Sequence, residues 1–150
     1  MSSYSEILFQ LVFASKNRTS FLNIINEEAL YNYMAGIVRH RRSIPYQIGG
    51  FGNHIHLIIS LHPSESVSNM VRDVKRASHF WMLDKKDLYK KFPGWQVGYG
   101  AFTYSLSAKK NLINYVKNQD PHHRKISFEE EYIKLLKEYE IKYDLKYLFE

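Results

Sequence analysis

The sequence predicts an α+β protein with a ferredoxin-like (RNA-recognition-motif-like) antiparallel sheet in the order β-α-β-β-α-β, followed by extra C-terminal helices. Three observations lead to this prediction. Apolar stretches of strand length alternate with helical repeats in that order. Glycines join the second and third strands in a hairpin, so these two strands run antiparallel. The 150 residues, of which 45% are hydrophobic, are enough for one core, so we expect a single domain over residues 1–150.

The first strand and the first helix occupy the N-terminal part of the chain. Residues 4–15 contain an apolar run long enough for a central strand, and the basic stretch 16–20 follows as a connection. Asn26 is a suitable N-cap for a helix whose first turn carries two glutamates, which favour the positive end of the helix dipole. Apolar residues repeat at helical spacing up to Val38, and the basic residues 39–42 suit the end of the helix.

The third strand carries two histidines on one of its faces. Residues 44–51 form the second strand, and a glycine-rich turn leads into the stretch 52–61. Successive side chains of a strand point to opposite faces, so His54 and His56 share one face while an aliphatic stripe lies on the other. The aliphatic stripe should meet the two crossover helices. We therefore expect His54 and His56 on the face that these two helices leave free.

The second helix is predicted over residues 66–83, with basic residues opposite its apolar side. This basic stripe consists of Arg72, Lys75, Arg76 and His79. A charged, mobile loop is expected over residues 84–91, and residues 95–105 complete the sheet as its fourth strand.

Two more helices are predicted after the sheet, near residues 107–118 and 127–141. Tyr115 and Gln119 are four positions apart, which places them on one side of the first of these helices or of its last turn. Between the two helices lies a pair of histidines that we interpret as solvent-exposed, His122 and His123.

The composition excludes several classes of protein. The chain has no cysteine, which rules out thiolate catalysis, cysteine-ligated zinc sites and disulfides. The sequence shows no signal peptide, and no apolar run approaches the roughly 18 residues of a membrane-spanning helix. These features predict a soluble cytoplasmic protein.

Charge is distributed unevenly along the chain. Residues 1–126 contain 17 Lys and Arg against 8 Asp and Glu, a balance of +9, whereas residues 127–150 contain 4 against 7, a balance of −3. A basic body favours a polyanionic partner, nucleic acid above all, although a solvated basic surface is the alternative.

Four residues together indicate a specific chemistry. The pair His54 and His56 alone fits either a metal site or two polar neighbours on a strand. Two imidazoles and the Gln119 amide oxygen would give a metal three ligands and leave positions open for a phosphate. The hydroxyl of Tyr115 on the same helix side is then a candidate nucleophile.

With these residues the sequence resembles a known family. His54-Ile55-His56 is similar to the His-hydrophobic-His motif of the HUH nucleases. The spacing of Tyr115 and Gln119 is similar to the motif of the single-tyrosine transposases, found in small insertion sequences and as REP-associated tyrosine transposases. The first and fourth strands also resemble those of the family, so the likeness extends over residues 7–149.

The resemblance implies a transposase that cleaves and rejoins single-stranded DNA at transposon ends with subterminal hairpins. Tyr115 would form a 5′-phosphotyrosine, while His54, His56 and Gln119 would hold a divalent metal, Mg²⁺ or Mn²⁺. No nucleotide cofactor would be needed, because the phosphotyrosine conserves the bond energy. The resemblance also implies a homodimer and favours one in which the helix with Tyr115 serves the partner subunit, a choice that the sequence alone leaves open.

Two other functions fit parts of the sequence. A replication initiator or relaxase of the HUH superfamily would also nick single-stranded DNA, although such chains are usually longer. A non-catalytic module of the same fold would bind single strands through aromatic residues of its sheet and need no metal. For the transposase and for the replication initiator or relaxase alike, the candidate DNA contacts are basic residues, namely Arg72, Lys75, Arg76, Lys16 and Arg18.

Overall fold

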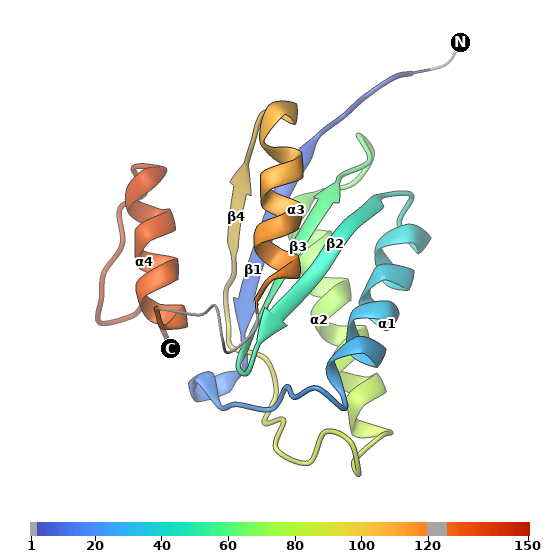
Figure 1. Ribbon diagram of the computed structural model, residues 1–150, viewed down its shortest axis with the longest axis vertical. Coiled ribbons are helices and arrows are strands. Elements are labelled where there is room, and N and C mark those ends of the chain that lie inside the picture. The colour runs from blue at the N-terminus through green and yellow to red at the C-terminus, as the bar shows by residue number, and fades with distance from the viewer. Residues whose placement is uncertain (1–2, 120–125) are drawn as a thin grey trace.

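A computed structural model of the protein describes residues 3–119 and 126–150 (Figure 1), so the prediction for His122 and His123 lies outside the described residues. The strands are β1 (Leu8–Ala14), β2 (Ile44–Phe51), β3 (His54–Ser60) and β4 (Gly100–Thr103). The helices are α1 (Glu27–His40), α2 (Val67–Leu83), α3 (Lys109–Lys117) and α4 (Phe128–Glu138), with short 3-10 turns η1 (Lys16–Arg18) and η2 (Leu106–Ala108).

The four strands form one antiparallel sheet in the order β2-β3-β1-β4. With α1 and α2 as crossovers, this is the predicted ferredoxin-like plan. The apolar run of β1 makes it a central strand, paired on one side with β3 and on the other with β4. In this register His56 lies between Val12 of β1 and Gly49 of β2.

Helices α1 and α2 cover one face of the sheet, behind it in the view of Figure 1. Their apolar residues, among them Leu30, Met34 and Val74, form the main core with the aliphatic stripe of β3. Ile55, Leu57 and Ile59 of that stripe are fully buried. The prediction that the histidines face away from α1 and α2 is therefore confirmed.

The second face of the sheet is not free, contrary to the expectation from the sequence. Helix α3 lies across β2 and β3, where Val116 packs against Leu8 and Ile58. Helix α4 packs on β1 and β4 through a second apolar cluster that includes Val12 and Phe102. The two C-terminal helices carry apolar sides of their own, and burying these sides on the sheet removes them from water.

The segment between α2 and β4 is anchored to the body of the protein, although the sequence predicts a mobile loop. Tyr89 is only 4% exposed, and its hydroxyl donates a 2.7 Å hydrogen bond to the carbonyl oxygen of Asn26. The side chain of Asn26 does not cap α1. Its Nδ2 instead donates to the carbonyl oxygens of Phe21 and Leu88, which ties the start of α1 to the same segment. Within the part of the chain that is described, no helix combines the length and apolar character needed to cross a bilayer.

Candidate active site

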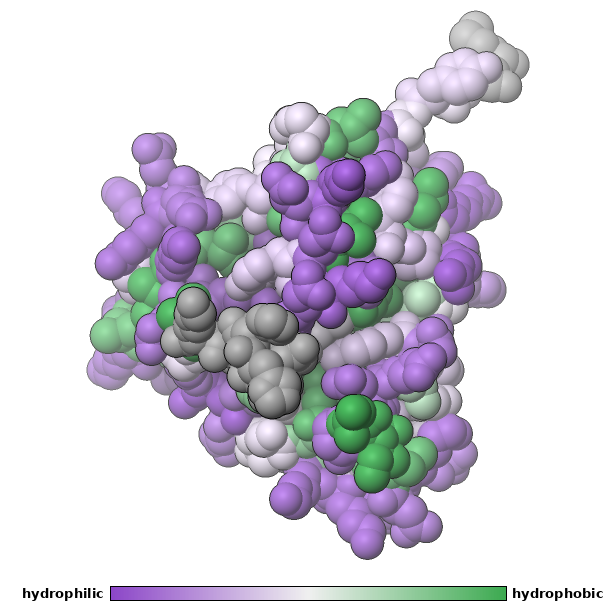
Figure 2. Space-filling view, in the orientation of Figure 1, coloured by the Kyte–Doolittle hydropathy of each residue, from purple (hydrophilic) through white to green (hydrophobic). Residues whose placement is uncertain are grey.

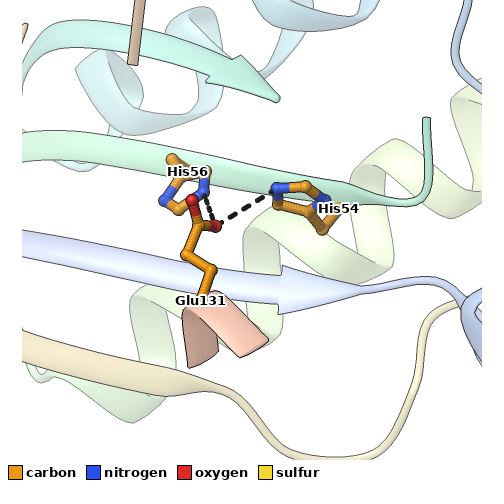
Figure 3. A group of neighbouring side chains, drawn as sticks. All are labelled: His54, His56 and Glu131. Carbon is orange, nitrogen blue, oxygen red and sulfur yellow. Dashed lines mark hydrogen bonds and ion pairs between the residues drawn. The ribbon is translucent and has the colours of Figure 1, made fainter. Parts of the chain in front are cut away.

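His54 and His56 lie side by side on β3, beneath α4, with ring centroids 5.1 Å apart (Figure 3). Both side chains are fully buried. The Nδ1 of His54 donates to Oδ1 of Asn53 at 2.9 Å, and the Nδ1 of His56 donates to Oε1 of Gln10 at 2.7 Å. These hydrogen bonds fix both rings, and the Nε2 atoms of both turn toward one carboxylate.

The carboxylate belongs to Glu131 of α4. Its Oε1 lies 2.9 Å from Nε2 of His56 and 3.4 Å from Nε2 of His54. Helix α4 begins at a capped end, where the Ser127 hydroxyl accepts from the backbone N–H of Glu130, and this places Glu131 one turn into the helix. Burial raises the pKa of Glu131, but hydrogen bonds with His54 and His56 outweigh burial and hold this pKa well below its usual range.

Tyr115 meets the same group from α3. Its hydroxyl donates a hydrogen bond to Oε2 of Glu131, and its ring lies edge-on to that of His56 with centroids 6.1 Å apart. The side chain of Tyr115 remains 47% exposed, unlike the two histidines. The structure thus brings Tyr115 to His54 and His56 within one chain.

A cavity of about 630 Å³ opens beside these residues. Tyr115, Gln119 and Glu131 all line it, so Gln119 lies in the same cavity as the tyrosine and the carboxylate. Its role as a metal ligand stays a prediction. Among the histidines, aspartates and glutamates of the described residues, His54, His56 and Glu131 have ligand atoms within 4.8 Å of one another. The sequence reasoning missed Glu131, and it also missed Gln10 and Asn53, which hold the two rings.

A signal for Glu131 is nevertheless present in the sequence. The residue follows two other glutamates at the start of a helix, a pattern typical of an ordinary favourable interaction with the helix dipole. However, Phe128, Glu131 and Leu135 are spaced three and four apart, so Glu131 occupies the apolar side of α4. A carboxylate in such a position must be paired with a partner when it is buried.

The basic stripe of α2 lies on the sheet face opposite the histidines, since α2 packs on the aliphatic side of β3. Arg72 and Arg76 are exposed. Lys75 is partly buried, and its Nζ donates to the carbonyl oxygens of Gln96 at 2.9 Å and Gly98 at 2.5 Å. Burial lowers the pKa of Lys75 to about 8.

The two basic residues after β1 differ in their contacts. Arg18 bonds the C-terminal segment, through Glu129 Oε1 at 2.7 Å and the carbonyl oxygen of Phe149 at 2.8 Å. Lys16 is exposed at the other end of the same turn. The roles of these residues and of the α2 stripe in DNA binding stay predictions.

A ferredoxin-like sheet with two adjacent histidines that face a helix-borne tyrosine is the arrangement that the sequence predicts for a single-tyrosine HUH transposase. A model of the family described as "Transposase IS200 like" matches residues 3–119, and the chain belongs to this family. Membership implies a DNA strand-transfer enzyme that acts in DNA transposition of insertion sequences.

Two solved structures share the fold. A protein from Deinococcus radiodurans R1 described as a transposase is 18% identical, with a TM-score of 0.61, over 79% of this chain and 95% of that chain. A REP-associated tyrosine transposase bound to a REP hairpin is 17% identical, with a TM-score of 0.55, over 77% of this chain and 70% of that chain. A comparison with curated proteins found no match.

Proposed function

We propose that this protein cleaves and rejoins single-stranded DNA at transposon ends through a 5′-phosphotyrosine on Tyr115. One observation carries the proposal. The Tyr115 hydroxyl lies next to a buried histidine pair in the same chain and is held there by Glu131, while its ring stays accessible from the adjoining cavity. A tyrosine with a purely structural role would require neither the neighbouring histidine pair nor access from the cavity.

The reaction is a pair of transesterifications. The oxygen of Tyr115 attacks the scissile phosphorus, the tyrosine loses its proton, and the bond to the 3′-oxygen of the preceding nucleotide breaks. This oxygen takes up a proton and leaves as a 3′-hydroxyl. A second 3′-hydroxyl then attacks the phosphotyrosine, which restores the phosphodiester and frees Tyr115. A tyrosine has a pKa of about 10, so the attack requires help at neutral pH.

We propose that His54 and His56 hold a divalent ion, Mg²⁺ or Mn²⁺, with Gln119 as the further ligand that the family resemblance implies. The fit is supported by the two Nε2 atoms, which converge on one point while each Nδ1 is hydrogen-bonded to an amide oxygen. When bound, such an ion polarises the scissile phosphate and stabilises its charge. Gln10 and Asn53 keep the two rings in place.

The surface around the cavity suits a DNA strand. Figure 2 shows a mainly hydrophilic surface over α3, and the helix includes exposed Lys110, Asn114 and Lys117. No acidic residue occurs in α3. We propose single-stranded DNA with subterminal hairpins as the substrate, in line with the REP hairpin bound to the related structure, and a homodimer as the assembly.

The test is covalent trapping of the DNA. Full-length protein is incubated with Mn²⁺ and single-stranded oligonucleotides that carry candidate transposon ends, and the adduct is mapped by mass spectrometry. We expect the adduct on Tyr115 and its loss in Tyr115→Phe, which removes one oxygen and little packing. Tyr99→Phe is a matched control, because Tyr99 is 39% exposed against 47% for Tyr115 and lies outside the cavity. An adduct on another tyrosine, or undiminished cutting by Tyr115→Phe, would refute the proposal.

A further inference from the structure

The carboxylate of Glu131 connects the two halves of the candidate active site. Its Oε1 faces the Nε2 atoms of His54 and His56, and its Oε2 accepts the hydroxyl of Tyr115. Glu131 lies outside residues 3–119, the span in which the chain matches its family. The site of this protein is thus assembled with a group from the C-terminal segment.

Helix α4 is held over the histidines by several independent contacts. The ring of Phe128 packs on that of His54 with centroids 4.7 Å apart, and Phe128 and Leu136 are buried in the cluster beneath α4. Arg18 binds Glu129, and the Tyr139 hydroxyl donates to the carbonyl oxygen of Thr103 at 2.7 Å. These contacts fix the helix on both sides of Glu131, so the carboxylate is delivered to the histidines by packed structure.

The three groups are close enough to be grouped around one ion, since their ligand atoms lie within 4.8 Å of one another. Glu131 Oε1 lies 2.9 Å and 3.4 Å from the two Nε2 atoms, so a bound cation would take the place of the protons that these atoms share. Each histidine donates its Nδ1–H to an amide oxygen, so Nε2, which contacts Glu131 in this structure, is the nitrogen that would bind a metal.

The donor chemistry also favours the carboxylate over a neutral amide. Mg²⁺ and Mn²⁺ prefer hard oxygen ligands, and a carboxylate adds a full negative charge that an amide lacks. Two histidines and one carboxylate leave further positions open for oxygens of a scissile phosphate.

We propose that Glu131 is a further protein ligand of the divalent ion at His54 and His56, beside Gln119, and that its second oxygen positions Tyr115 for attack. This inference rests on the proposed function and adds Glu131 to the ligands proposed there. Two other roles are open to a buried glutamate here. It is either a purely structural partner of the histidines or an occupant that a metal ion must displace, and each predicts a different effect on metal affinity.

The decisive measurement is Mn²⁺ affinity, followed by the electron paramagnetic resonance of free Mn²⁺ with full-length protein. We expect Glu131→Gln, which keeps the shape and removes the charge, to weaken binding at least tenfold, about the loss known for even an outer-shell partner. Glu138→Gln is the matched control, because Glu138 lies on the same helix and lines the same cavity but is exposed. It should leave the affinity unchanged.

Each alternative has its own result. Unchanged affinity in Glu131→Gln would show a structural partner, and tighter binding would show a displaced occupant, and either overturns the inference. Weaker binding in Gln119→Ala with normal binding in Glu131→Gln would overturn it in favour of the amide. A wild-type protein that binds no Mn²⁺ would refute the metal dependence in the proposed function, and this inference with it.

Two further measurements test the two parts of the proposal separately. A crystal structure of Mn²⁺-loaded wild type should place Glu131 Oε1 in the coordination sphere, whereas a carboxylate turned away from the ion would overturn the inference. For the positioning of Tyr115, Glu131→Gln at saturating Mn²⁺ should lose about a hundredfold in kcat with little change in KM for the oligonucleotide. A loss confined to KM would overturn this part, and Glu131→Asp, which keeps the charge, should restore part of the metal affinity.

Discussion

At the scale of single residues, Gly49 shows how the strand sequence sets the position of the nucleophile. A Cβ at this position would lie 2.7 Å from the carbonyl oxygen of Val116 and 3.0 Å from its Cγ1. Only a glycine at this position lets the backbone of α3 approach β2 so closely. The contact is made by Val116, the residue that follows Tyr115 in the helix. Gly49 also lies opposite His56 in the sheet, so one glycine sets the separation of tyrosine and histidine.

This close approach predicts opposite effects for two glycine substitutions. Gly49→Ala should destabilise the protein by about 1–3 kcal/mol through overpacking and reduce cleavage, because α3 must move outward. Gly36→Ala should stabilise it by about 0.5–1 kcal/mol, since Gly36 is an exposed residue inside α1. Beyond its chain neighbours and the backbone of its own helix, an alanine Cβ there would meet no atom of the described residues within 4 Å.

Urea denaturation of both variants measures these effects as shifts of the transition midpoint. Equal stability of Gly49→Ala and wild type, with unchanged cleavage, would mean that α3 does not depend on this contact.

The sequence identifies most of the site, and the part that it misses has a physical reason. The alternation of a strand places His54 and His56 together, and helical spacing places Tyr115 and Gln119 together, because both are local patterns. Glu131 reaches the histidines only through the packing of α4 on a face that the sequence predicts to be free. Patterns of neighbouring residues in the sequence do not predict a contact between segments so far apart.

At the scale of elements, the segment between α2 and β4 is joined to α1 by buried polar contacts. Tyr89 donates to the carbonyl of Asn26, while Nδ2 of Asn26 donates to the carbonyl of Leu88. Burial raises the pKa of the Tyr89 phenol to about 12. The folded protein therefore keeps the phenol of Tyr89 neutral to a higher pH than the unfolded chain does, in which a tyrosine is deprotonated near pH 10.

The contribution of Tyr89 to the free energy of unfolding therefore depends on pH. The contribution of Tyr89 is fully present below about pH 10 and is lost as the pH rises toward 12. We expect the free energy of unfolding of the wild type to fall over this window. Tyr89→Phe should lose about 1–3 kcal/mol at neutral pH, since the Asn26 carbonyl is left without its donor, and should fall less steeply with rising pH. Parallel curves for the two proteins would contradict the prediction.

The basic stripe of α2 divides into two kinds of residue. Arg72 and Arg76 are exposed to solvent, where they can meet phosphates, while the Lys75 ammonium already binds two backbone carbonyls. If the stripe contacts DNA, Arg72→Ala and Arg76→Ala should each reduce the log–log salt slope of single-strand binding by about 0.7, and Lys75→Ala should change it less. Binding isotherms at several salt concentrations test this, and slopes equal to wild type for both arginine variants would assign the stripe to a solvated surface.

The bounds of the elements differ from the sequence prediction where the backbone takes unusual conformations. The fourth strand is predicted over residues 95–105 but spans Gly100–Thr103. Gly98 has a φ of 92°, which a strand cannot accommodate, and Trp95 pairs with Ser15 only as an isolated bridge. Asn26 fails as a side-chain cap because its Oδ1 accepts from the backbone N–H of Asn23 at 2.8 Å, while its Nδ2 donates to the carbonyl oxygens of Phe21 and Leu88.

At the scale of the whole molecule, one chain brings Tyr115 to its own histidine pair, whereas the family resemblance favours helices exchanged between subunits. Tyr115 lies over His56 of the same subunit, so a homodimer built from such chains has two independent sites. Two inactive proteins, Tyr115→Phe and His54→Ala/His56→Ala, should therefore remain inactive when their subunits are mixed. Light scattering measures the assembly, and fluorescence energy transfer between labelled subunits verifies that exchange has occurred.

The opposite outcome is equally informative. If cleavage returns to a fraction of the wild-type rate, the helix with Tyr115 serves the partner subunit in the active dimer. A wild-type mass equal to that of one chain would instead refute the homodimer.

The strand order has a consequence for how the protein reaches its native state. β1 pairs with β4 in a register that joins Phe9 to Thr103 and Val12 to Gly100. These partners are roughly 90 positions apart, so the sheet depends on contacts of high sequence separation and should form slowly, as in other domains of high contact order. Until β4 arrives, β1 has an open edge of apolar residues that another chain can pair with. Refolding yield should therefore decline as protein concentration rises, through aggregation that begins at the strand in the centre of the finished sheet.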